Sequence, residues 1–300
     1  GLIPMVTSIS GAQLFTAGQT TLPLAIANAG TSLANVLNPA GFGTNPTGST
    51  LARLNAFNAL RQQDLSNNFI KEASHITDLA MQANSALQTS QEVTVTFPTT
   101  NIGQQLKQVA RLIKKRLDLN VNRQVFYVQI GGFDTHTNEL AGQINLFSQF
   151  SQAMRAFYDE MVVQGVNNDV TTFTLSDFGR TLNPAGSGAT VRSDHAWGNH
   201  MFVMGGAVAG GDFYGSQRPE GTGNYYPTLV MGPTGLDDTD NSATASRGRW
   251  IPTTSVEMYA VRLARWFGLS PADEALVFPG LANPLITQHD AANSALNFIP

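Results

Sequence analysis

Residues that could ligate a metal ion gather in three short stretches of this 300-residue sequence. Asp134 and His136 form an Asp-x-His motif, and Asp194 and His195 form an Asp-His pair. Because the chain has no cysteine, a transition-metal site must use imidazole and carboxylate ligands, both of which zinc accepts. The candidate ligands are Asp134, His136, Asp177, Asp194, His195 and His200. These residue types predict a divalent metal site, with zinc, manganese, iron and calcium as the candidate ions.

Arg180 adds a cation to this set of acidic and imidazole side chains. A guanidinium group can bind a tetrahedral oxyanion through two N–H donors, so we expect Arg180 to hold the oxyanion of a substrate. Thr135, Ser176 and Ser193 are the nearby hydroxyl groups that could serve as a nucleophile. An ordinary hydroxyl group needs a base or a metal ion to activate it, and none of the three can be identified as the nucleophile from the sequence.

The metal-ligand candidates also have structural interpretations. Asp134 could cap the helix that follows it, and Asp177 could form an ion pair with Arg180. His200 precedes an apolar run and could be a satisfied core histidine. The sequence does not decide between these interpretations and metal ligation, nor whether Asp177 and Asp194 share one site.

The elements that must position these residues form a strand–loop–helix–strand unit. Short apolar runs with β-branched and aromatic residues predict strands at 124–130 and 170–175, and one-sided apolar spacing predicts a helix at 139–164. A right-handed crossover would make the two strands parallel, so that their carboxyl ends meet at one edge of a sheet, where ligands bind. We therefore expect the candidate ligands that follow both strands to lie close together.

The rest of the chain completes the expected α/β domain. We predict a single domain over residues 1–300, with an irregular and helical region at 1–94, a core at 95–280 and a tail at 281–300. Within it, residues 101–117 have the apolar spacing of an amphipathic helix with a basic, solvated outer face. A capped helix is expected within 247–271, beginning after Thr253, Thr254 or Ser255.

The composition excludes several classes of protein. A net charge of −4 and a pI of about 5.7 argue against a nucleic-acid-binding protein, which needs a basic surface to neutralise phosphates. No run of 18 apolar residues is present, so we expect no membrane span. Charged residues make up only 13% of the chain, against about 25% in an ordinary soluble domain. The polar surface must therefore be built largely from neutral groups.

Four motifs resemble the bacterial family catalogued as domain of unknown function 1501. They are RQVFYVQIGGFDTHTN, VTTFTLSDFGRTLN, SDHAWGNHMFVMGGAVAGGDFYG and GRWIPTTSVEMYAVRLARWFGL, which together span most of residues 95–280. The resemblance implies an alkaline phosphatase-like α/β fold, with a mostly parallel central sheet, flanking helices and metal ions at the strand ends. It also implies twin-arginine export and therefore a periplasmic or extracellular location.

Carried over to this sequence, the resemblance assigns roles to individual residues. Asp134 and His136 resemble the Asp/His pair that superfamily members use for one metal ion. The SDFG segment resembles the Ser-Asp-His-Gly motif of phosphatases, with Phe178 in the position of the histidine. His200 and the Asp194–His195 pair would then supply imidazoles, or that pair would itself be the Asp-His motif of the superfamily.

The chain departs from the family at its amino-terminal end. Family members open with a Gly-Gly-x-Asp motif followed by a Ser-His motif; residues 1–94 contain no Gly-Gly-x-Asp motif, and the Ser74-His75 pair there does not follow one. The sequence therefore resembles the carboxyl-terminal two-thirds of a family member, and we expect association with the missing segment or with another chain.

Three functional hypotheses follow. The leading one is an exported metal-dependent hydrolase acting on a phosphate or sulfate ester, either a small molecule or a polysaccharide ester. The second is a non-catalytic secreted structural, polysaccharide-binding or self-assembling protein that keeps the fold. The third is a scaffold that binds calcium through the same carboxylates, and histidine ligation would distinguish the first from the third.

Overall fold

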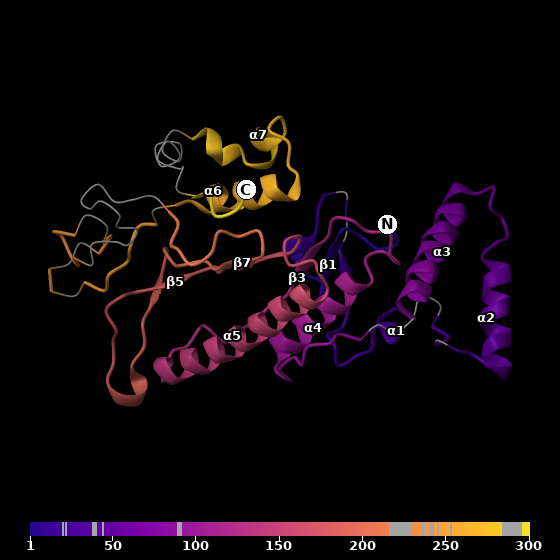
Figure 1. Cartoon of the computed structure of the whole chain (residues 1–300), viewed down its shortest axis with the longest axis horizontal. Helices are drawn as coiled ribbons and strands as arrows, with labels where there is room; N and C mark the ends of the chain where they lie inside the picture. Colours follow the sequence, from indigo (N-terminus) through magenta and orange to yellow (C-terminus); the bar gives the residue numbers. More distant parts are fainter. Residues whose placement is uncertain are drawn as a thin grey trace. The chain divides into compact units, whose positions relative to one another are not determined.

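The computed structural model describes residues 1–19, 21, 23–37, 41–43, 45–88, 92–215, 230–235, 238–240, 243–244, 246–252, 254–283 and 296–300. The chain divides into two compact units, whose helices and strands are labelled in Figure 1. Unit 1 comprises residues 1–131 and 146–165, and unit 2 comprises residues 132–145 and 166–300. The expectation of a single domain stays a prediction.

Unit 1 contains a three-stranded parallel sheet. The strands are β1 (Val6–Ser8), β2 (Leu24–Ala25) and β3 (Val125–Tyr127), in the order β2-β1-β3. Thr7 and Ser8 of the central strand are fully buried, as expected for a strand paired on both sides and covered by helices. The expectation of a mixed α/β fold with a parallel sheet flanked by helices is thereby confirmed.

Helix α4 (Asn101–Lys114) supplies much of the core of unit 1. The Thr100 hydroxyl accepts a hydrogen bond from the Gly103 N–H and caps the helix, and the buried residues include Leu106, Val109 and Leu112. The Gln105 side chain bonds to both the N–H and the carbonyl of Gln129, each at 2.8 Å, just beyond the end of β3. These bonds fix the helix against the sheet.

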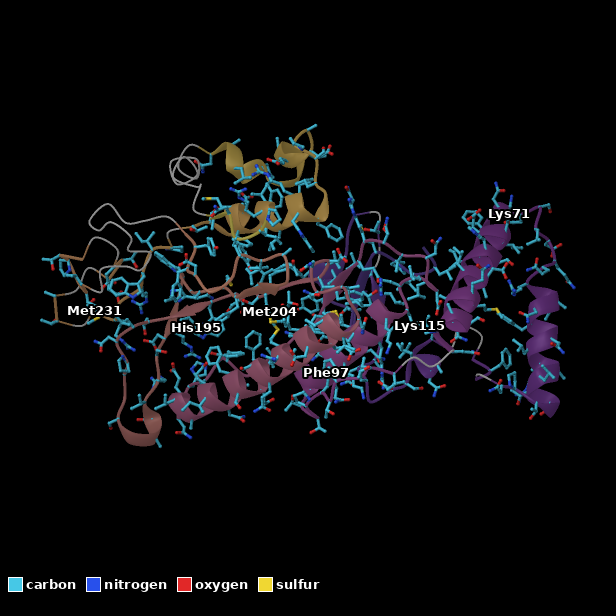
Figure 2. The ribbon with its side chains drawn as sticks, in the orientation of Figure 1. Lys71, Phe97, Lys115, His195, Met204 and Met231 are labelled. Carbon is cyan, nitrogen blue, oxygen red and sulfur yellow. The ribbon has the colours of Figure 1, made fainter. Side chains whose placement is uncertain are left out.

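The prediction that the basic side chains of residues 101–117 lie on a solvated outer face is wrong for Lys115 and Arg111. Lys115, at the carboxyl-terminal cap of α4 (Figure 2), is only 1% exposed and pairs with Asp118 at 2.8 Å. Arg111 is buried and forms a two-pronged ion pair with Glu92. Long side chains can bury their stems while the charged group finds a partner, and the spacing of a sequence does not reveal that partner.

Helix α5 (Glu139–Val163) begins in unit 2 and continues in unit 1. Its unit 1 portion buries Phe157, Met161 and the charged Glu160. The Glu160 carboxylate accepts hydrogen bonds at 2.9 Å from the N–H groups of Thr94 and Val95, and from the Gln164 side chain. Glu160 therefore anchors the extended segment that leads to α4.

The other helices of unit 1 precede α4 in the chain. They are the 3-10 helix η1 (Leu14–Thr16) and the α-helices α1 (Leu33–Val36), α2 (Gly48–Leu60) and α3 (Asn68–Gln88). An ion pair of 2.6 Å between Arg61, which caps α2, and Asp78 links α2 to α3. None of the residues of α2 is buried.

Unit 2 contains two short antiparallel strand pairs. Strand β4 (Thr171–Phe173) pairs with β7 (Val203–Gly205), and β5 (Gly179–Arg180) pairs with β6 (His195–Ala196). The expected parallel pairing of the strands predicted at 124–130 and 170–175 is wrong, because β3 pairs with β1 and β4 pairs with β7. A local pattern predicts that a strand exists, whereas its neighbours depend on contacts between distant parts of the chain.

The core of unit 2 forms around α6 (Val256–Phe267). Ser255 caps this helix by accepting a bond from the Met258 N–H, and Gly268 ends it with a φ of 111°. Buried residues of α6 pack against residues from the end of the chain: Met258, Tyr259, Leu263, Leu296, Phe298 and Ile299. The expected tail at 281–300 therefore ends in core residues, while 284–295 lie outside the described residues.

Short helices complete unit 2. They are η2 (Gly188–Thr190), α7 (Glu274–Val277) and η3 (Pro279–Ala282). Among the described residues of the whole chain, no helix combines the length and the apolar character needed to cross a membrane.

Candidate metal centre

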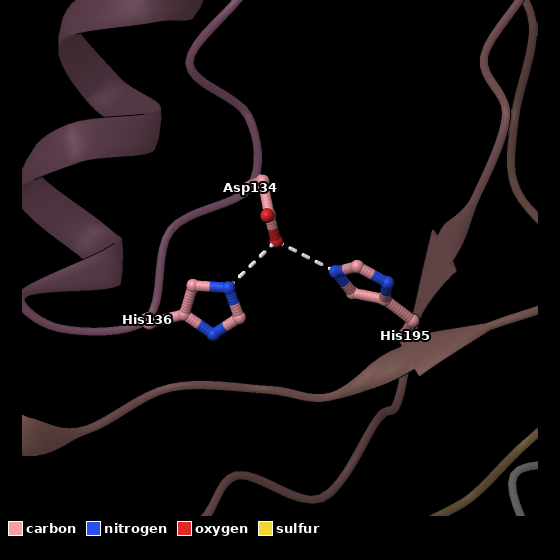
Figure 3. Close-up of side chains that lie close together, drawn as sticks. All are labelled: Asp134, His136 and His195. Atoms are coloured by element: carbon pink, nitrogen blue, oxygen red, sulfur yellow. Dashed lines mark hydrogen bonds and ion pairs between the residues drawn. The ribbon is translucent and has the colours of Figure 1, made fainter.

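One carboxylate and two imidazoles meet on the surface of unit 2 (Figure 3). The Asp134 Oδ1 atom lies 2.7 Å from His195 Nε2 and 3.0 Å from His136 Nε2. The three donor atoms lie within 4.8 Å of one another. Each side chain is about half or more exposed: 54% for Asp134, 66% for His136 and 49% for His195. A solute in the surrounding water can therefore reach all three donors.

Side chains of α5 and β5 form hydrogen bonds with the loop that carries Asp134 and His136. Thr135, between the two candidate ligands, accepts hydrogen bonds of 3.2 Å at its hydroxyl oxygen from Gln143 and from Arg180. Gln143 also donates to the Phe133 carbonyl oxygen at 3.2 Å. Because these bonds hold the residues on both sides of Asp134, the backbone of the loop has little freedom to move.

His195 is fixed by the β5–β6 strand pair and by an aromatic ring. It lies directly opposite Arg180 in the strand register, and the neighbouring pair is Gly179 with Ala196. The Phe178 ring stacks on the His195 ring with centroids 4.0 Å apart and an angle of 16° between the planes. This stacking orients the imidazole plane of His195.

Three of the candidate ligands from the sequence lie outside this group. The Asp194 carboxylate forms an ion pair of 2.8 Å with Arg247. Asp177 and His200 are both exposed, and neither belongs to the one three-donor group found among the described residues. The structure thus brings together Asp134, His136 and His195 and leaves the other three apart.

The guanidinium of Arg180 faces main-chain oxygens. It donates to the carbonyl oxygens of Phe133, Thr135 and Ser193 at 2.5, 3.0 and 2.7 Å. An ion pair of 3.5 Å joins it to Glu139, at the start of α5. Glu139 is not among the residues predicted for the site, because an acidic residue in the first turn of a helix is common and carries no sign of another role.

The hydroxyl groups considered as nucleophiles are all engaged in hydrogen bonds. Thr135 accepts the two bonds described above, Ser176 donates to the Phe178 carbonyl oxygen at 2.9 Å, and Ser193 donates to Glu139 at 2.5 Å.

The electrostatics of the group favour an ionised carboxylate. The hydrogen bond from His195, and secondarily that from His136, lowers the pKa of the Asp134 carboxyl below its usual value. Asp134 therefore carries its negative charge at neutral pH, the form in which a carboxylate ligates a metal ion.

The donor set fits a transition-metal ion in type and number. Three protein ligands and an open position are typical of catalytic zinc sites, and two imidazoles favour zinc, manganese or iron over calcium. Ligand atoms about 2.1 Å from an ion at tetrahedral angles lie about 3.4 Å apart, so each imidazole nitrogen must move away from the Asp134 oxygen by only about 0.4–0.7 Å. Side-chain rotation on an exposed surface can supply that change.

Comparison with known proteins identifies the family. The family described as "Protein of unknown function (DUF1501)" matches residues 17–245, about three quarters of the chain, including the three clustered residues. The chain belongs to this family, as its motifs predicted. No curated protein and no solved structure matches the chain.

Proposed function

We propose that this member of the DUF1501 family is an exported, metal-dependent hydrolase that acts on a phosphate or sulfate ester. The observation that carries the proposal is the convergence of Asp134 and His136, from one loop, and His195, from strand β6, onto one exposed point. The alkaline phosphatase-like superfamily, the substrate class and a periplasmic or extracellular location enter the proposal through the resemblance of the motifs.

The three clustered residues would hold a divalent ion, with zinc, manganese or iron favoured over calcium. Such an ion, when bound, polarises the ester and makes water more acidic. Asp134 contributes the negative charge, and each imidazole contributes a neutral nitrogen donor when it carries its proton on Nδ1 and presents Nε2 to the ion. The exposure of the group leaves room for either a small ester or an ester on a polysaccharide.

The metal content of the purified protein tests this proposal. We expect close to one equivalent of zinc, manganese or iron after extensive dialysis, measured by plasma mass spectrometry. The His136→Ala/His195→Ala double variant should retain almost none, and the matched control His75→Ala, an exposed histidine of α3, should keep the wild-type content.

The ester substrates are tested next with p-nitrophenyl phosphate and p-nitrophenyl sulfate. Turnover by the wild type and His75→Ala, and its loss in the double variant, would support the hydrolase. If the wild type binds none of the three ions when they are added, and none raises its melting temperature, the proposal is refuted.

A second candidate is a secreted protein that binds polysaccharide without catalysis. Exposed aromatic residues of unit 2 favour it, since Trp197, two positions after His195, is 65% exposed and Phe202 is 51% exposed. Flat aromatic rings can pack on the apolar faces of sugars. Retention on polysaccharide beads that is lost in Trp197→Ala, without ester turnover by the wild type, would favour this function over the first.

A further inference from the structure

We propose that Arg180 and Glu139 form a clasp that holds the two ligand-bearing loops at the spacing required for metal binding. We use 'ligand-bearing loops' for two segments. The first is 133–136, which carries Asp134 and His136, and the second is 193–195, which leads into β6 and ends at His195. In this role Arg180 is a positioning residue and does not touch the ion or the substrate. The inference rests on the proposed function for its metal-binding consequence, but the clasp itself can be tested without metal.

The first half of the clasp is the fork of Arg180. Its Nη2 donates to the Phe133 carbonyl and the Thr135 hydroxyl, while its Nη1 donates to the carbonyl oxygens of Thr135 and Ser193. One guanidinium therefore bonds to residues on both sides of Asp134 and to a residue two positions before His195.

The second half of the clasp is the carboxylate of Glu139. One of its oxygens accepts from the Ser193 N–H and the other from the Ser193 hydroxyl, both at 2.5 Å. The 3.5 Å ion pair between Glu139 and Arg180 closes the network. Ser193 is thus held through its N–H, its hydroxyl and its carbonyl group.

Burial makes these bonds effective. The Arg180 and Glu139 side chains are each 19% exposed, so water competes weakly for their donors and acceptors, and each charge compensates the other. The planar guanidinium aims its N–H groups in fixed directions, which is what bonding to two loops requires. A lysine in the same place has the charge but a single nitrogen.

The geometry of β5 and β6 links the clasp to the ligand itself. Arg180 and His195 are paired in the strand register. The Phe178 ring stacks on His195, and its centroid lies 5.4 Å from the guanidinium carbon of Arg180. Loss of the clasp should therefore release both the position of the His195 backbone and the orientation of its ring.

The experiment compares Arg180→Lys and Glu139→Gln with the wild type and with Arg249→Lys. Arg249 is the matched control, because it pairs with Asp240 in the same unit but contacts neither ligand-bearing loop. Zinc affinity is measured by isothermal titration calorimetry, and the visible absorption of bound cobalt(II) reports the ligand geometry. Amide hydrogen exchange of the metal-free proteins reports how firmly residues 133–136 and 193–195 are held.

We expect both clasp variants to bind zinc about 10- to 100-fold more weakly, with an altered cobalt spectrum and an unchanged melting curve for the rest of the protein. Their two loops should exchange at least about tenfold faster than in the wild type, while Arg249→Lys behaves as the wild type does. A wild-type affinity and spectrum in Arg180→Lys would overturn the clasp, because they would show that the charge alone suffices.

A wild type that binds neither zinc nor cobalt would refute the proposed function and leave hydrogen exchange to decide on the clasp. Faster exchange confined to the two loops in Arg180→Lys would then uphold it. Unchanged exchange would overturn it.

Discussion

The contact between Gly179 and Gly198 provides a quantitative test of how the candidate metal centre is built. A Cβ atom at position 179 would lie 1.9 Å from the Gly198 carbonyl oxygen, whereas real Cβ atoms essentially never approach such an atom within 3.0 Å. Gly179→Ala must therefore move β5 away from the chain that follows β6 by about 1 Å. Because β5 is only two residues long, this movement strains the whole β5–β6 pair, in which His195 lies opposite Arg180.

The expected cost follows from the contacts that this movement breaks. Overpacking a well-filled site costs about 1–3 kcal/mol. Losing two hydrogen bonds of the strand pair adds about 0.5–1.5 kcal/mol each. Gly179→Ala should thus lower the free energy of unfolding of unit 2 by about 2–6 kcal/mol and weaken zinc binding in parallel.

Urea unfolding followed by tryptophan fluorescence measures this effect specifically. All three tryptophans, Trp197, Trp250 and Trp266, lie in unit 2, so their emission reports the unfolding of that unit. Gly131→Ala is the control, since a Cβ there meets nothing within 4 Å and should change stability by less than about 1 kcal/mol. A Gly179→Ala protein with wild-type stability and zinc affinity would refute the described packing around His195.

Three other changes test separate parts of the fold. Glu160→Leu should lower the free energy of unfolding of unit 1 by about 2–5 kcal/mol, because the partly buried N–H groups of Thr94 and Val95 lose a charged acceptor. Glu160→Gln should lose less, since its amide oxygen still accepts, and equal losses in circular dichroism unfolding curves would contradict this account. Ser255→Ala should lower the free energy of unfolding by about 1 kcal/mol, because it removes the cap bond of α6. Thr47→Ala should lower it by only about a few tenths of a kcal/mol, because the Thr47 side chain makes no cap bond in α2, and urea midpoints would show whether the two variants differ. The ion pair with Arg111 lowers the pKa of Glu92 from 4.5 to about 2, so the pair stabilises the protein fully above pH 4.5 and loses its effect as the pH falls toward 2. Solvent screening of this half-exposed group limits the loss to below about 1 kcal/mol. Glu92→Gln should flatten the dependence of the urea midpoint on pH over that range, whereas an unchanged pH profile would argue against the pair.

Much of the local structure could be predicted from the sequence. The runs at 124–130 and 170–175 contain strands β3 and β4, the one-sided spacing after residue 139 forms α5, and Ser255 is the cap of α6. These features depend on residues close together in the chain, for which periodicity and capping are direct signals. Family membership was equally visible, because whole motifs carry it.

The arrangement of the site was less predictable. Proximity to strand ends placed six side chains in one set, but only the structure separates the three that converge from Asp194, which turns to Arg247. The same holds for Arg180: its type fits an oxyanion, whereas its direction toward main-chain carbonyls depends on how two distant loops approach each other. Side-chain direction and strand pairing are both set by contacts between distant parts of the chain.

The packing of the final residues against α6 has a consequence for synthesis on the ribosome. Met258, Tyr259 and Leu263 are buried partly by Leu296 and Phe298, which are made more than 30 residues later. At about 5–20 residues per second, Leu296 and Phe298 are made about 2–7 s after this apolar face. Unit 2 therefore completes its core only after residue 298 has been made and can reach α6.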